Sequence, residues 1–186
     1  MTKKALFIDR DGVINKSIIR NGKPYAPINF LEFEMLDGVE EAFYLLKKSE
    51  YMSIIVTNQP DIASGKQTLL SLNKLHNYLQ EKYSIDLIRV CPHKEEDGCD
   101  CRKPKPGMII SASKKLNINI NFSYMIGDRW TDILCGQRAG CKENFYIDNN
   151  YSEKKPDKPF THVPSLLHCV RKILAINDDV DQTLKC

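Results

Sequence analysis

The feature that most constrains the fold of this chain is a regular alternation of short apolar runs with segments of helical periodicity. The apolar runs are typical of buried strands and occupy residues 4–8, 52–57, 87–91, 124–127 and 144–147. Apolar residues recur with helical spacing over residues 39–48, 69–83, 108–116, 131–139 and 163–174. This alternation predicts an α/β fold with a doubly wound, mainly parallel sheet and helices on both faces.

Length and charge restrict the classes of protein that the chain can belong to. The 186 residues, 42% of them hydrophobic, suffice for one well-packed core, and we expect a single domain over residues 1–177 with a disordered tail over 178–186. The net charge of +3 provides no field strong enough to favour nucleic acid. The first apolar run ends at Ile8, too early for an export signal or a membrane span. We therefore expect a cytoplasmic monomer.

The segment 14–37 shows neither a strand-like apolar run nor helical spacing of apolar residues. It is punctuated by Gly22, Pro24 and Pro27, which are typical of turns. The sequence predicts a short hairpin or flap here, lying over the end of the first strand.

Polar side chains follow three of the predicted strands directly. Asp9 and Asp11 follow the first strand, Thr57 and Asn58 end the second, and Asp128 follows the fourth. The carboxyl ends of parallel strands meet at one edge of a sheet, so these side chains are expected to share one crevice. Three carboxylates repel one another unless a cation lies among them, and oxygen ligands suit Mg²⁺. The pattern therefore predicts a Mg²⁺-dependent phosphoryl-transfer site.

A second cluster combines cysteine and histidine. The chain has seven cysteines. Three of them, Cys91, Cys99 and Cys101, lie close in sequence to His93. Four such ligands can close a tetrahedral Zn²⁺ site without an open position, which is typical of a structural metal. We expect this zinc loop to span residues 91–103. The alternative is a chance grouping of reduced cytosolic thiols beside a surface histidine.

Four motifs give the chain a resemblance to a known family. They are DRDG at residues 9–12, TNQ at 57–59, the lysine of RKP at 102–104, and GDRxxD at 127–132. In this order they resemble the haloacid-dehalogenase-like phosphatases, which implies a Rossmann-like sheet with at most a minimal cap. The resemblance implies that Asp9 is the nucleophile and Asp11 the general acid and base. It also implies that Mg²⁺ is held by Asp9, the main-chain carbonyl of Asp11, and Asp128.

The remaining motif residues receive binding roles from the same resemblance. Thr57, Asn58 and Lys103 would hold the transferred phosphate, and Arg102 would contact the distal part of a compact substrate. Asp132 lies one helical turn beyond Asp128 and could brace it there, but our expectation for Asp132 is only the stabilising role of a carboxylate in the first turn of a helix.

The zinc loop resembles that of two groups within the family. Cys-x-His followed by Cys-x-Cys-Arg-Lys-Pro is similar to the heptose-1,7-bisphosphate 7-phosphatases and to the histidinol-phosphate phosphatases. The heptose reading implies removal of the 7-phosphate from D-glycero-D-manno-heptose 1,7-bisphosphate during synthesis of lipopolysaccharide or surface-glycan precursors. One position departs from the heptose pattern, because Ser64 stands where that pattern has arginine. A substrate with two phosphates is therefore an open expectation, as is the preferred anomer.

Two alternatives come from other functional classes. A nucleic-acid 3′-phosphatase shares the catalytic motifs, but the chain has no broad basic stripe with interleaved aromatic residues, and Trp130 is its single tryptophan. A zinc-binding module without catalysis would not need the ordered set of carboxylates.

Overall fold

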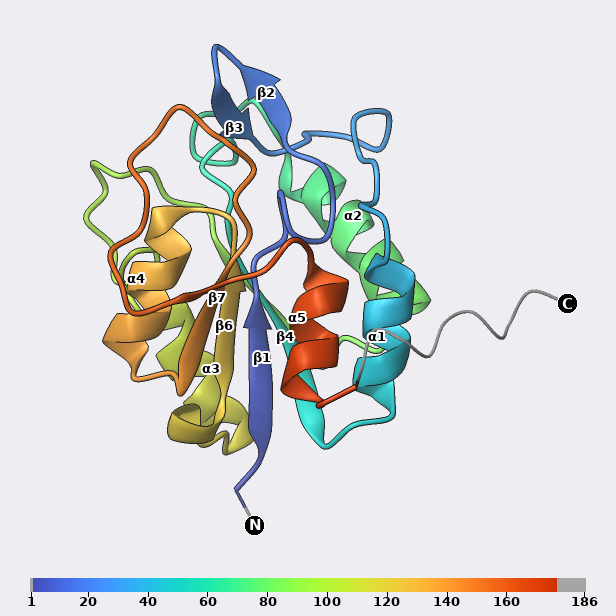
Figure 1. Cartoon of the computed structure of the whole chain (residues 1–186). Coiled ribbons are helices and arrows are strands. Elements are labelled where there is room, and N and C mark those ends of the chain that lie inside the picture. The colour runs from blue at the N-terminus through green and yellow to red at the C-terminus, as the bar shows by residue number, and fades with distance from the viewer. Residues whose placement is uncertain (1, 177–186) are drawn as a thin grey trace, which may run out of the picture.

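The protein contains a six-stranded sheet in which every neighbouring pair of strands is parallel (Figure 1). The computed structural model describes residues 2–176. The strand order is β5-β4-β1-β6-β7-β8. The strands are β1 (Lys4–Ile8), β4 (Tyr51–Asn58), β5 (Leu87–Cys91), β6 (Tyr124–Gly127), β7 (Glu143–Tyr146) and β8 (Thr161–His162). The predicted doubly wound, mainly parallel α/β fold is confirmed.

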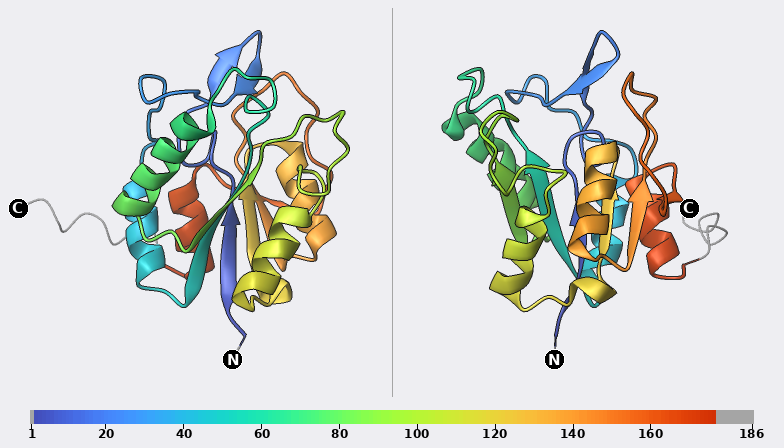
Figure 2. Two further views of the ribbon diagram at one scale, coloured as in Figure 1. Left: turned by 180° about the vertical axis from the view of Figure 1, so that it is seen from behind. Right: turned by 90° about the vertical axis from the view of Figure 1, so that its left-hand side faces the viewer.

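Helices cover both faces of the sheet. One face carries α1 (Val39–Lys47), α2 (Leu69–Lys82) and α5 (Leu166–Ile173). The opposite face carries α3 (Gly107–Leu116) and α4 (Trp130–Ala139), and the short 3₁₀ helix η1 (Ile120–Phe122) precedes β6. Figures 1 and 2 show the two groups on opposite sides of the sheet.

The two-residue period of β1 divides the core between these layers. Leu6 and Ile8 are fully buried in the cluster that contains the apolar faces of α1 and α5, whereas Ala5 and Phe7 are fully buried against α3 and α4. Because β1 is apolar on both faces, it occupies the centre of the sheet. Asp9 is the residue that follows it, so the centre of the carboxyl edge receives a carboxylate.

The structure differs from the sequence prediction mainly near the C-terminal end of the sheet. The five predicted strands are present to within one residue at each end, but β8 was not predicted because two residues carry no readable periodicity. The last helix begins at Leu166 rather than at residue 163. The reason is that the Ser165 hydroxyl caps it by accepting a hydrogen bond from the His168 amide.

The segment before α1 forms the expected hairpin. Strands β2 (Ile18–Arg20) and β3 (Lys23–Tyr25) pair antiparallel, and the turn residues Asn21 and Gly22 have φ of 51° and 73°. Two positive φ angles match the twist of a tight hairpin, and Gly and Asn adopt them readily. The hairpin lies beyond the carboxyl ends of the strands, at the top of Figure 1.

Two further expectations concern the chain as a whole. Among residues 2–176, no helix has the length and apolar character needed to cross a bilayer. The predicted disordered tail, residues 178–186, lies outside the described residues.

Candidate active site

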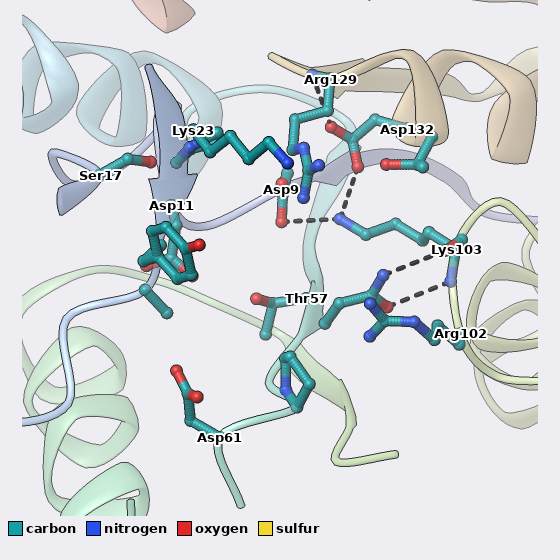
Figure 3. A pocket seen from close by; sticks show the side chains of 16 residues that line it. Asp9, Asp11, Ser17, Lys23, Thr57, Asp61, Arg102, Lys103, Arg129 and Asp132 are labelled. Atoms are coloured by element: carbon teal, nitrogen blue, oxygen red, sulfur yellow. Dashed lines mark hydrogen bonds and ion pairs between the residues drawn. The ribbon is translucent and has the colours of Figure 1, made fainter. Parts of the chain in front are cut away.

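Residues of all four motifs line one pocket of about 270 Å³ at the carboxyl edge of the sheet, although Asp128 itself is not among them (Figure 3). The pocket is lined by residues that follow β1, that end β4 and that start α4. The hairpin contributes Lys23 and Tyr25, and the zinc loop contributes Arg102 and Lys103. Segments far apart in the sequence thus enclose one cavity, as expected for the carboxyl edge of a parallel sheet.

Three carboxylates cluster at the site, and two of them, Asp9 and Asp132, line the pocket. Asp9, Asp128 and Asp132 each place an oxygen within 4.8 Å of the others, and their exposed fractions are 6%, 0% and 1%. Asp132 was expected only to stabilise the start of α4. Its Oδ2 does accept a hydrogen bond from the Arg129 amide at 2.9 Å, but the side chain also belongs to the carboxylate cluster.

Lys103 is the buried cation of the site. Its Nζ lies 2.7 Å from Oδ1 of Asp9 and 2.6 Å from Oδ1 of Asp132, and it donates to the Val56 carbonyl at 2.9 Å. Burial alone would lower the pKa of Lys103, but the negative charges of Asp132 and Asp9 outweigh burial and raise it. The ammonium group therefore stays charged and forms ion pairs with two of the three carboxylates, Asp9 and Asp132.

The carboxylate cluster has the properties of a divalent-cation site. Burial, and next the charge of Asp132, raise the pKa of Asp9 to about 7, although Lys103 opposes this. Burial, followed by Asp9 and Asp132, also raises the pKa of Asp128 well above its usual value. Oδ1 of Asp128 is buried and has no hydrogen-bond partner among the described residues. A hard cation is the group that satisfies this oxygen and relieves the repulsion between the carboxylates.

Asp11 lies in the pocket wall but outside the carboxylate cluster. Its oxygens accept hydrogen bonds from the Arg10 guanidinium at 2.9–3.0 Å, from Asn15 at 2.9 Å and from Gln59 at 2.8 Å. Arg10 is completely buried. The side chain of Asp11 is thus oriented by a set of buried donors rather than by the other carboxylates.

The end of β4 places Thr57 and Asn58 beside Lys103. Gln59 donates to the Thr57 hydroxyl oxygen at 2.8 Å, which leaves the hydroxyl hydrogen available to a ligand. The Asn58 side chain bonds both to the Lys103 amide and to the Lys103 carbonyl, each at 3.1 Å. Asn58 therefore positions Lys103, and its expected contact with a phosphate stays a prediction.

The zinc-loop side chains converge on one point. The Sγ of Cys91 lies 3.6 Å from that of Cys99, and the Sγ of Cys101 lies 3.4 Å from that of Cys99 and 3.3 Å from Nδ1 of His93. The ligands of a tetrahedral zinc with Zn–S bonds of 2.3 Å are separated by about 3.7 Å. The four side chains are therefore close enough to hold one Zn²⁺. Arg102 follows them and donates to the His93 carbonyl at 3.1 Å.

Some residues of the site were not found by sequence analysis. Arg10 stands inside the DRDG motif, and its position between two site carboxylates was the signal that could have drawn attention to it. His76 contacts Arg10 from α2, with 3.0 Å between Nε2 and the guanidinium. Asn149 and Tyr151, in the segment that follows β7, both contact Asp128. No local sequence pattern identifies His76, Asn149 or Tyr151 as residues of the site.

The contact between His76 and Arg10 leads to a prediction about stability at acidic pH. Burial, followed by the Arg10 charge, lowers the pKa of His76 to about 3, whereas an unfolded histidine titrates near 6.5. Between these values the unfolded state binds the extra proton, so stability is lost as the pH falls below 6.5. We expect this group to lower the free energy of unfolding by about 2 kcal/mol between pH 7 and pH 5.

Urea denaturation of the wild type and of His76→Gln at both pH values checks this expectation. A glutamine oxygen can accept from Arg10 but does not titrate, so the variant should lose less stability on acidification. Parallel pH profiles for the two proteins would contradict the assignment.

Comparisons with known proteins agree with this geometry. The HAD-hydrolase-like family model matches residues 100–169. A D-glycero-beta-D-manno-heptose-1,7-bisphosphate 7-phosphatase of Helicobacter pylori is 37% identical over 157 residues, which cover 80% of this chain and 86% of that protein. A D-glycero-alpha-D-manno-heptose-1,7-bisphosphate 7-phosphatase of Campylobacter jejuni is 33% identical over 173 residues, covering 90% and 96%.

A solved structure supports the fold independently. The D,D-heptose 1.7-bisphosphate phosphatase from B. bronchiseptica, complexed with magnesium and phosphate, superposes with a TM-score of 0.80 over 93% of this chain and 99% of that one, at 24% identity. The curated relatives, at 33% and 37% identity, confirm the resemblance that the four motifs predicted. From its fold and its curated relatives, the chain belongs to the D-glycero-D-manno-heptose-1,7-bisphosphate 7-phosphatase family of haloacid-dehalogenase-like phosphatases.

Proposed function

We propose that this phosphatase removes the 7-phosphate from D-glycero-D-manno-heptose 1,7-bisphosphate through an aspartyl-phosphate on Asp9. The observation that carries the proposal is the environment of the Asp9 carboxylate. Oδ1 is held by Lys103 at 2.7 Å and by the Arg10 amide at 2.7 Å. Oδ2 makes no hydrogen bond within the described chain and belongs to a residue that lines the pocket. One oxygen is therefore anchored while the other is available to attack phosphorus.

The chemistry of the other carboxylates supports Mg²⁺ as the cofactor. Asp9, Asp128 and the main-chain carbonyl of Asp11 would hold the ion, as in the family resemblance, with Asp132 close to it. When bound, Mg²⁺ would neutralise negative charge developing on the phosphoryl oxygens. The unpartnered Oδ1 of Asp128 is the observation that fits this ion.

The residues of the chain divide the reaction between them. As Oδ2 of Asp9 forms its bond to phosphorus, the ester P–O bond breaks, and Asp11 gives a proton to the leaving sugar oxygen. A water molecule then attacks the aspartyl-phosphate and loses a proton to Asp11, which releases inorganic phosphate and restores Asp9. Lys103 and the Thr57 hydroxyl, both buried at the pocket, would stabilise the phosphoryl oxygens throughout.

The zinc loop is proposed to be structural. Cys91, His93, Cys99 and Cys101 supply four ligands, so a bound Zn²⁺ would have no open position for water. Arg102 and Lys103 follow the last ligand directly in the chain. The metal would therefore fix the start of the segment that brings the catalytic lysine and Arg102 into the pocket.

Positive side chains at the mouth of the pocket support a substrate with a second phosphate. Lys23 from the hairpin, Arg102 from the zinc loop and Arg129 from the start of α4 all line the pocket that contains Asp9 (Figure 3). Glu153 holds Arg129 through Nε at 3.0 Å. These cations can take the role of the arginine that Ser64 replaces in the heptose pattern, because they face the same pocket.

The pocket also contains one carboxylate away from the metal cluster. Asp61 lines the pocket, and among the described residues its Oδ1 has only a long contact, of 3.4 Å, with the Ser64 hydroxyl. A carboxylate repels phosphate but accepts hydrogen bonds from sugar hydroxyls. We therefore place the hydroxyl-bearing face of the heptose toward Asp61 and the second phosphate toward the three cations.

The test is a specificity panel under Mg²⁺. It compares both anomers of D-glycero-D-manno-heptose 1,7-bisphosphate with heptose 7-phosphate, histidinol phosphate and simple sugar phosphates. We expect kcat/KM to be highest for a bisphosphate, by about 10-fold or more over heptose 7-phosphate, because charge-assisted hydrogen bonds contribute about 1.5–3 kcal/mol each. A preference for histidinol phosphate would replace the heptose assignment by the alternative in histidine biosynthesis.

Charge variants locate the second phosphate in the same assay. Arg129→Met should lower kcat/KM for the bisphosphate by about 10-fold or more while changing that for heptose 7-phosphate much less. Lys66→Met is the matched control, because this exposed lysine does not line the pocket. Equal losses on both substrates in the Arg129 variant would remove the arginine from the second phosphate site.

A further inference from the structure

The two oxygens of Asp128 have different surroundings. Oδ2 accepts a hydrogen bond from the Tyr151 hydroxyl at 2.6 Å and another from Nδ2 of Asn149 at 3.2 Å. Oδ1 is equally buried and has no partner within residues 2–176. The donors that reach this carboxylate therefore all act on one oxygen, and the other is left for a different kind of ligand.

Both donors come from the segment that follows β7. Nδ2 of Asn149 also donates to the Gly12 carbonyl at 2.9 Å and lies 3.1 Å from the Tyr151 hydroxyl, so the two side chains support each other. Tyr151 is 8% exposed. Tyr151 is thus a buried neighbour of the carboxylate cluster, in direct contact with Asp128.

The backbone of the catalytic loop packs closely against this contact. Gly12 has φ of +84°, and a Cβ on it would lie 1.7 Å from Oδ2 of Asp128 and 2.7 Å from the Tyr151 hydroxyl. The catalytic loop, the carboxylate and the tyrosine are therefore in direct contact. A hydrogen bond from a phenol to a buried carboxylate is charge-assisted and directional, so it fixes the plane of the carboxylate.

The same segment is attached to the hairpin over the pocket. The Ser152 amide donates to the Gly22 carbonyl at the hairpin turn at 2.8 Å. The residue next to Tyr151 is therefore anchored on its other side, and this second attachment limits how far the tyrosine can move from Asp128.

We propose that Tyr151 and Asn149 are positioning residues of the cation site, which hold Oδ2 of Asp128 so that Oδ1 faces the metal. The inference rests on the proposed function for the identity of the metal as Mg²⁺. Partners that orient a metal ligand in this way typically change metal affinity by about 10- to 100-fold when they are removed. Neither residue touches the substrate or the reacting atoms in this assignment.

The experiment measures Mg²⁺ binding directly, by isothermal titration calorimetry without substrate. We expect Tyr151→Phe to raise the Kd for Mg²⁺ by about 10-fold or more. Tyr146→Phe is the matched control, because the Tyr146 hydroxyl contacts Asp148 at 3.4 Å rather than Asp128. Its Kd should equal that of the wild type. The same Kd in Tyr151→Phe as in the control would overturn the proposal.

Activity measurements separate positioning from damage to the fold. In Tyr151→Phe, kcat should return to the wild-type value at saturating Mg²⁺, whereas a distorted site would stay slow at every concentration. Asn149→Ala, which removes the weaker donor, should shift the Kd in the same direction and serves if Tyr151→Phe does not fold. An unchanged Kd in that variant as well would contradict the assignment. Mg²⁺ binding without turnover of any heptose phosphate would refute the proposed substrate and leave this inference standing.

Discussion

Replacing Asp9 by asparagine is expected to abolish phosphate release, with a loss in kcat on the order of 10⁴- to 10⁶-fold. An amide cannot replace the carboxylate oxygen that forms the bond to phosphorus, and spontaneous hydrolysis of phosphate monoesters is too slow to contribute. Inorganic phosphate released from heptose 1,7-bisphosphate under Mg²⁺ is the measured quantity. A variant that keeps more than about 1% of the wild-type kcat would contradict the assignment of Asp9 as nucleophile.

The fold of the Asp9→Asn protein should persist, which makes the test clean. Lys103 keeps Asp132 as a partner at 2.6 Å, so the substitution does not leave a buried ammonium without a counter-charge. Circular dichroism and zinc content should match those of the wild type. Asp157→Asn, at an exposed position outside the pocket, is the control for removal of one negative charge. This comparison also distinguishes the phosphatase from a zinc-binding module without catalysis.

Cys101→Ser is expected to lose zinc and to destabilise the protein by on the order of 5 kcal/mol. Structural zinc contributes about 10–16 kcal/mol in zinc-finger peptides, and here part of the loop is also held by the core. A loss of this size approaches the whole stability of many domains. Urea denaturation and metal analysis by mass spectrometry measure the effect. Activity should fall with it, because Lys103 lies two residues beyond the replaced ligand.

Cys141→Ser is the matched control for the zinc ligand. This cysteine is partly buried and lies outside the Cys₃His cluster, so its replacement should leave zinc content at the wild-type value. If Cys101→Ser kept both full stability and bound zinc, the loop would need a different explanation. Zinc lost without any change in stability would show that the metal does not support the fold.

Much of the fold could be predicted from the sequence because strands and helices leave local patterns of apolar residues. The short apolar runs predicted all five longer strands of the sheet, and β1 was predicted residue for residue. Strand β8 was missed because its two residues pair with β7 only through the packing of the segment around them. The start of α5 was misplaced by three residues for a different reason. A serine cap, not hydrophobic periodicity, sets where that helix begins.

The candidate site also contains residues that the sequence predicted and one whose role the sequence did not reveal. Asp9, Thr57 and Asp128 were predicted to share a crevice because each follows or ends a parallel strand. The carboxyl ends of parallel strands lie at the same edge of a sheet, so the three side chains must lie near one another. The cysteine cluster was readable because its four ligands lie within eleven residues. Asp132 was undervalued, since the helix dipole explains a carboxylate at that position without revealing that Lys103 lies beside it.

By itself, the sequence determined the order of the elements, the strand ends that carry carboxylates, and the cluster of three cysteines and one histidine, because short-range periodicity and spacing encode all three. Only the tertiary structure decided which groups orient those side chains. Asn149 reaches the Gly12 carbonyl across 137 positions of the chain, and Arg10 meets His76 across 66. Contacts of this kind form when helices and loops pack against the sheet, and no local sequence pattern predicts them.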